Sequence, residues 1–246
     1  MARKKHQPQS AARTLEEIET RGDRLTEWVS SNPMPILGTA LAVIVIAGAW
    51  GITTQRSETA TDESAAALAK VQEDYRVAMG ATPGSVEIAE PANPETARVV
   101  RAEYVGLYEE VAQAHSGQKA AALALLEAGE LHRALGDLDA AAEAYERALA
   151  SLPSGDVIRA FAQVRIGAAQ EAAGRFAEAG DAYAAAGEIT GYPLRFDALA
   201  DAARSYSRAG NRDGALAAFT RIEMEAPDYQ LPPYLRARRA ELRSAE

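Results

Sequence analysis

The chain has 246 residues, 48% of them hydrophobic and 6% aromatic, and it carries a formal net charge of −9 at pH 7. This length allows one large or two small domains, and the acidic balance argues against nucleic acid as a partner because phosphate binding needs clustered lysine and arginine. The absence of cysteine excludes disulfides, thiolate metal sites and cysteine nucleophiles.

The N-terminal residues 1–32 are predicted to form a cytoplasmic tail, and the first 13 of them are polar and basic. After these, apolar residues recur at spacings that keep one helical face apolar. This pattern predicts a short amphipathic helix on a membrane surface, and a solvated juxtamembrane segment is the alternative. The apolar residues are Leu15, Ile18, Leu25, Trp28 and Val29.

An uncharged segment at 35–52 predicts a single N-terminal transmembrane helix, within the range 33–54. About 20 apolar residues span the hydrocarbon core, and a helix is the only single segment that satisfies its own backbone there. Trp28 and Trp50 lie near the ends of the uncharged run, where indole rings favour the interface. The alternatives are a buried core helix and a cleaved signal peptide, since Ala47-Gly48-Ala49 resembles a cleavage site.

The basic residues around this segment predict its orientation. Six lysines and arginines precede it, whereas Arg56 and Lys70 are the only two in the 20 residues that follow it. The positive-inside rule then places the N-terminus in the cytoplasm and the large C-terminal part across the membrane.

Residues 55–117 are predicted to form a helical linker and a degenerate helical hairpin. A helix over 56–79 ends before Gly80, a residue that suits the left-handed position just past a helix C-terminus. A proline-rich loop follows over 81–94, and a second helix is expected at 95–115, with its apolar residues on one stripe.

Residues 118–228 contain three similar units, each with two helices joined by a turn that begins with glycine. The glycines are Gly136, Gly174 and Gly210, which lie 38 and 36 residues apart. A small residue follows each turn where paired helices must nearly touch, and an aromatic residue four positions later is expected to fill the gap to the next helix. The small residues are Ala141, Ala179 and Ala215, and the aromatic ones are Tyr145, Tyr183 and Phe219.

These units resemble the tetratricopeptide repeat family. Before the turns, Gly129, Gly167 and Ala203 match the small position of the first helix, whereas Gln163, Gly187 and Arg212 replace apolar residues of the pattern. We therefore expect looser packing in the middle and last repeats. The resemblance implies an all-α solenoid, and residues 229–246 are expected to form the polar-faced capping helix that solenoids need.

No constellation of catalytic residues is present. His6, His115 and His132 are scattered, and no glycine-rich phosphate loop, nucleophile elbow or zinc-protease motif occurs. We expect no enzymatic activity, no cofactor and no metal.

The tetratricopeptide resemblance implies a groove lined by the first helix of each repeat. Most positions that hold a carboxylate in some family members are apolar here, so this groove suits an apolar segment or an amphipathic helix, the chain's own C-terminus included. Arg204 and Arg208, at one end, favour an acidic residue on the partner. The alternative is that these side chains pack between helices or face solvent. The predicted groove residues are Leu126, Glu130, Arg133, Val164, Ala168, Glu171, Ala200, Arg204, Ser207 and Arg208.

The layout of a basic tail, one span and exported repeats also resembles the ancillary SecYEG translocon subunit family of Gram-negative bacteria. That resemblance implies a single-pass inner-membrane protein with a periplasmic C-terminal domain. Its partners would be translocon subunits, periplasmic chaperones or exported chains. The alternatives are a general adaptor in envelope or cytochrome assembly, a self-associating structural module, and an enzyme or receptor with a hidden site.

Overall fold

The computed structural model describes residues 58–82, 91 and 93–244. The predicted tail (1–32), the predicted transmembrane segment (33–54) and most of the predicted loop at 81–94 lie outside these residues. Within them, every regular element is an α-helix, and none of these helices combines the length and hydropathy needed to cross a membrane.

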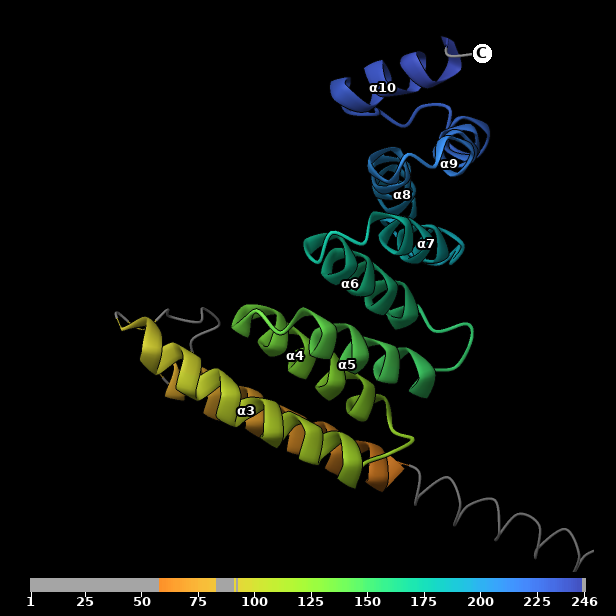
Figure 1. Ribbon diagram of the computed structural model, residues 1–246. Coiled ribbons are helices and arrows are strands. Elements are labelled where there is room, and N and C mark those ends of the chain that lie inside the picture. Colours follow the sequence, from red (N-terminus) through yellow and green to blue (C-terminus); the bar gives the residue numbers. More distant parts are fainter. Residues whose placement is uncertain (1–57, 83–90, 92, 245–246) are drawn as a thin grey trace, which may run out of the picture. The chain divides into compact units, whose positions relative to one another are not determined.

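The described chain is a succession of helices, each packed against the next (Figure 1). The prediction of an all-α solenoid is confirmed for these residues. Residues 58–78 form the first described helix. The others are α3 (Pro94–Ala114), α4 (Lys119–Leu135), α5 (Leu138–Ser151), α6 (Ile158–Ala172), α7 (Phe176–Gly187), α8 (Arg195–Ala209), α9 (Arg212–Glu225) and α10 (Pro233–Ser244).

Three hairpins, α4/α5, α6/α7 and α8/α9, correspond to the three predicted units. Gly136, Gly174 and Gly210 lie in their turns with φ of 88°, 77° and 74°. This left-handed conformation is disfavoured for residues with a Cβ, and it lets the chain reverse within two or three residues. The predicted glycine turns are confirmed.

In the first two of these hairpins, a glycine of the first helix packs against an aromatic ring of the second. A Cβ added to Gly129 of α4 would lie 2.6 Å from Cδ1 of Tyr145, on α5. In the next hairpin, Gly167 stands in the same relation to Tyr183. We expected these rings to fill the gap to the following helix, and they also pack closely on the helix that precedes their own. Because glycine has no side chain, it leaves space on the first helix, and the ring from the second helix occupies that space.

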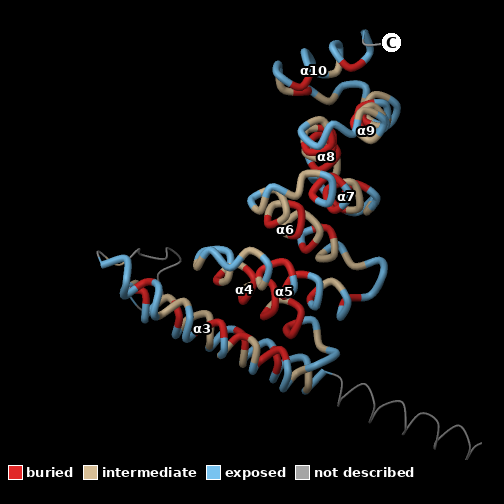
Figure 2. The backbone as a smooth tube through the Cα atoms, viewed as in Figure 1, coloured by how far each residue is buried: buried red, intermediate tan, exposed pale blue. Residues whose placement is uncertain are grey.

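A further hairpin precedes these three. Tyr75, on the helix at 58–78, packs against two tyrosines of α3, with ring centroids 5.3 Å from Tyr104 and 6.5 Å from Tyr108. Gln72 on the same helix donates a hydrogen bond to Glu127 of α4 at 3.2 Å. Buried residues lie where these helices face one another (Figure 2).

Two of the three departures from the repeat pattern are compensated in the structure. Leu199 of α8 fills the space left by Gly187, since a Cβ there would lie 2.6 Å from Leu199 Cγ. Arg212 donates two hydrogen bonds, at 2.9 and 2.8 Å, to the backbone carbonyl of Leu242. The arginine therefore ties the last hairpin to the end of α10.

The helix α10 covers the exposed end of the last hairpin. Leu235 and Leu242 are buried in one cluster with Phe219 and Ile222 of α9. Arg239 and Arg243, which helical spacing places beside these leucines, pair with Glu223 of α9, and Arg236 and Arg238 of α10 are exposed. This arrangement, with two buried leucines and an arginine-rich outer surface, is that of a solenoid cap.

Candidate functional site

The ten predicted groove residues lie on α4, α6 and α8, the first helices of the three hairpins. Leu126 and Ala200 are buried, with exposed fractions of 4% and 5%, so they add little accessible surface. Arg133 and Arg208 are exposed. The remaining six are half-buried, and they are Glu130, Val164, Ala168, Glu171, Arg204 and Ser207.

Glu130 joins α4, α5 and α6 because three side chains donate hydrogen bonds to its carboxylate. It accepts from Arg133 at 2.8 Å, from Arg165 of α6 at 2.8 Å, and from the hydroxyl of Tyr145 at 3.0 Å. Burial alone raises the pKa of Glu130, but the bonds from these three side chains outweigh it and hold that pKa below its usual value of 4.5. The carboxylate is thus ionised and satisfied within the protein.

Glu171 makes a similar junction between α6 and α8. Its carboxylate accepts from Arg204, and from Arg208 at 2.9 Å. Arg204 also donates to Asp201 at 2.8 Å. Burial lowers the pKa of Arg204, but its hydrogen bonds to these two carboxylates raise it above the usual range. Arg204 is therefore a structural link between first helices.

The ion pairs at Glu130 and Glu171 connect α4, α6 and α8, so one side of each of these helices contributes to a common face. Phe161 of α6 lies on this face. Phe161 precedes Val164 and Ala168 by three and seven positions, so helical spacing puts the three on one side of α6. Its side chain is 42% exposed, and its ring meets Tyr192 edge-on at 5.1 Å. Phe161 is not among the ten predicted groove residues, although the same spacing could have found it.

A pocket of about 420 Å³ lies between α8 and the capping helix α10. Three residues of α8, Arg204, Ser207 and Arg208, were among those predicted. The three from α10 were not, because no repeat pattern places the cap against α8. They are Tyr234, Leu235 and Arg238.

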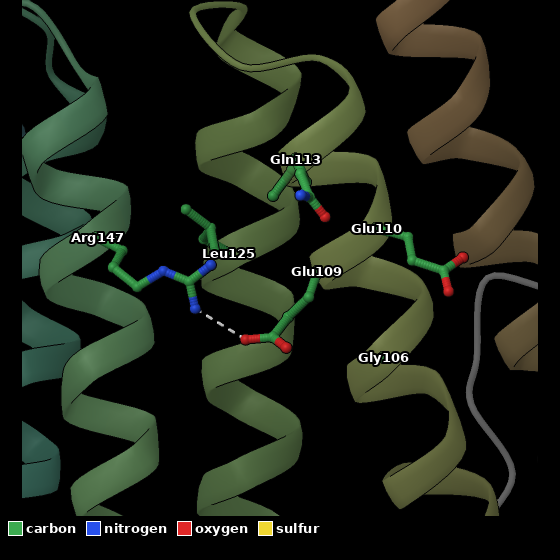
Figure 3. A pocket seen from close by; sticks show the side chains of 7 residues that line it. Gly106, Glu109, Glu110, Gln113, Leu125 and Arg147 are labelled. Atoms are coloured by element: carbon green, nitrogen blue, oxygen red, sulfur yellow. Dashed lines mark hydrogen bonds and ion pairs between the residues drawn. The ribbon is translucent and has the colours of Figure 1, made fainter.

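A second cavity, of about 490 Å³, lies between α3, α4 and α5 (Figure 3). Arg147 of α5 reaches across the buried Leu125 to Glu109 of α3, at 2.8 Å. Glu110 and Gln113 complete the rim. Its one cation is paired with one of its two carboxylates, so the cavity offers no converging set of reactive groups.

No group of three or more histidine, aspartate and glutamate side chains within the described residues could hold a metal ion. His115 and His132 belong to different segments, at the end of α3 and in the last turn of α4.

No family model matches this chain, and no curated protein matches it. Among solved structures, it is similar to a putative kinesin light chain from Podosopora anserina with nearly identical TPR-like repeats. The two share 20% identity, the match covers 61% of this chain and 80% of that one, and the TM-score is 0.46. A single-substitution variant of the same protein matches with the same values.

Proposed function

We propose that this chain is a membrane-anchored scaffold that binds a segment of another protein along the face of α4, α6 and α8. The observation that carries this proposal is the exposed aromatic side chain of Phe161, midway along that face. Exposed aromatic residues on a concave or grooved surface favour protein partners, because they bury large apolar area at small entropic cost.

The charged groups around Phe161 support an apolar partner. Glu130 of α4 and Glu171, near the end of α6, are both satisfied by arginines of the same chain. On the side of α6 that holds Phe161, Arg165 is paired with Glu130, and the other residues of this strip are the half-buried Val164 and Ala168. An apolar segment or the apolar face of an amphipathic helix complements this strip.

The finer proposal is that the segment at 33–54 anchors the chain in a bacterial inner membrane, with the repeats in the periplasm. In that setting the partners would be translocon subunits, periplasmic chaperones or exported chains. The uncharged run at 35–52 and the excess of basic residues before it support the anchor.

Photocrosslinking in native membranes tests the proposal. A photoreactive residue replaces Phe161 or Ala168 on the proposed face, and Ala177 of α7 or Ala217 of α9 as matched exposed controls. We expect translocon subunits or a periplasmic chaperone, identified by mass spectrometry, to be captured from the first two positions only. Capture of other assembly factors would favour the general adaptor, and capture of the chain itself would favour self-association. Equal capture from all four positions would contradict a binding face on α6.

A substitution tests whether capture depends on this face or on nonspecific hydrophobic contact. Phe161→Glu is expected to abolish capture from Ala168, because a carboxylate on the strip must be desolvated on binding. The control is Val99→Glu on α3, where the valine is also exposed, at 58%, but far from α6 in the succession of helices. Capture that survives Phe161→Glu would contradict the role of this face.

A further inference from the structure

The pocket between α8 and α10 is lined by a cluster of guanidinium groups. Three of its six lining residues are arginines, and none is acidic. Each of these arginines is paired with a carboxylate that lies outside the lining, namely Glu171, Asp201 or Glu241.

Two of the three guanidinium groups remain accessible. Arg204 is committed to Glu171 and Asp201, and its side chain is 26% exposed. The side chains of Arg208 and Arg238 are 53% and 43% exposed. Each of these two therefore presents donors to solvent while it is held by the protein.

Both accessible arginines are fixed in position. The guanidinium of Arg208 stacks on the ring of Phe176, 3.9 Å from its centroid, and also donates to Glu171. Arg238 donates to Glu241 and to the backbone carbonyl of Ser207. A pre-oriented guanidinium loses less side-chain entropy when it binds a planar anion than a free one does.

We propose that this pocket binds an acidic side chain of the segment that occupies the face of α4, α6 and α8. This inference rests on the proposed function and adds the chemistry of one partner residue. A carboxylate matches the geometry of guanidinium donors, and charge-assisted bonds of this kind are stronger than neutral ones. Leu235 and the exposed ring of Tyr234 provide apolar surface for the residue beside it.

The position of the pocket also sets the direction of the partner. Glu171 of α6 bridges to Arg204 and Arg208 of α8, so the pocket adjoins the end of α6 that lies farthest from Phe161. The acidic residue therefore lies toward the α10 end of the bound segment, and its apolar residues lie toward Phe161.

The test is a selection from a random dodecapeptide phage library on the full-length protein in detergent. We expect the wild type to enrich peptides that combine apolar residues with Asp or Glu. The double variant Arg208→Gln, Arg238→Gln is expected to enrich apolar peptides without the acid. The matched control is Arg236→Gln, which removes an exposed arginine of α10 that does not line the pocket and is expected to behave as the wild type.

Fluorescence anisotropy then measures the affinity of one selected peptide and of its Glu→Gln form for the wild type and for the double variant. The four affinities give the coupling between the acidic residue of the peptide and the two arginines. On the wild type we expect the Gln form to bind about 10-fold more weakly, and on the double variant the two forms should bind equally. The preference should also shrink at higher salt. Equal binding of both forms to the wild type would overturn this inference alone. Enrichment that is insensitive to Phe161→Glu would overturn the proposed function as well.

Discussion

At the scale of single residues, the same set of side chains, a glutamate with a tyrosine and an arginine, connects the repeats at two places. A tyrosine hydroxyl from a second helix and an arginine from the next first helix converge on one glutamate. Tyr145 and Arg165 do so at Glu130, and Tyr183 joins Arg204 at Glu171, with its hydroxyl 3.4 Å from the carboxylate. At the corresponding place in the last repeat stands Phe219, which has no hydroxyl. No further hairpin follows it in the described chain.

The contact between glycine and tyrosine predicts the effect of adding one methyl group. Gly129→Ala places a Cβ 2.6 Å from Cδ1 and 2.9 Å from Cζ of Tyr145, so the ring or the helix must shift. We expect a loss of about 1–3 kcal/mol in the free energy of unfolding, measured by urea denaturation. In contrast, Gly106→Ala on α3 meets no atom within 4 Å and should stabilise by about 0.5–1 kcal/mol. Stabilisation by both substitutions would contradict the close packing of α4 on Tyr145.

The lowered pKa of Glu130 predicts a dependence of stability on pH. Because its pKa is lower in the folded state than the usual 4.5, the carboxylate stabilises the fold above that pH. This contribution is lost as the pH falls through the folded-state pKa. We expect Glu130→Gln to cost about 1–2 kcal/mol at pH 7, and the difference from wild type to shrink below pH 4.5. Urea denaturation between pH 3 and pH 7 measures it.

Tyr145→Phe is the matched variant for this test. It keeps the Glu130 carboxylate and removes one of its three donors, so it should reduce the pH dependence only in part. A difference between Glu130→Gln and wild type that stays constant with pH would show that the carboxylate is not the group responsible.

At the scale of elements, the capping helix stabilises its neighbours through two leucines. Leu242 is 8% exposed and packs in the cluster that contains Phe219 and Ile222. Leu242→Ala is expected to cost about 2 kcal/mol, near the lower end for buried leucines, because this side chain keeps some contact with solvent. Hydrogen exchange should show lower amide protection in α8 and α9.

Arg236→Ala controls for this substitution, because Arg236 is exposed on the same helix. It should leave the protection of α8 and α9 unchanged. If Leu242→Ala lowered protection in α10 alone, the helix would not stabilise the last hairpin, and its role as a cap would be wrong.

At the scale of the whole described chain, the buried residues form two main clusters. The first extends from the helix at 58–78 to Ala182 of α7 and contains most of the buried leucines and four buried tyrosines. The second extends from α7 to α10. In a solenoid each unit contacts its neighbours only, so separate clusters can open with different free energies.

This division predicts two levels of protection against hydrogen exchange. The test is a substitution of Phe219, which is fully buried in the second cluster. We expect Phe219→Leu to lower amide protection in α8, α9 and α10 and to leave α4 and α5 unchanged, as measured by mass spectrometry. An equal loss of protection from α4 to α10 would mean that the clusters unfold as one cooperative unit.

The sequence by itself determined the helices, their turns and the repeat. The spacing of apolar residues and the glycines at Gly136, Gly174 and Gly210 act within one or two helical turns, so local physics suffices to find them. The resemblance to the tetratricopeptide repeat indicated which helices carry the candidate face.

Only the tertiary structure decided what that face offers. Leu126 and Ala200 have the correct spacing but are buried, because spacing gives the direction of a side chain and not how closely a neighbouring helix covers it. The link between Glu171 and Arg204 joins residues 33 positions apart, and the pocket unites α8 with Tyr234 and Arg238 of α10. These contacts depend on the angles at which successive hairpins pack, and those angles arise from the shapes of many side chains together.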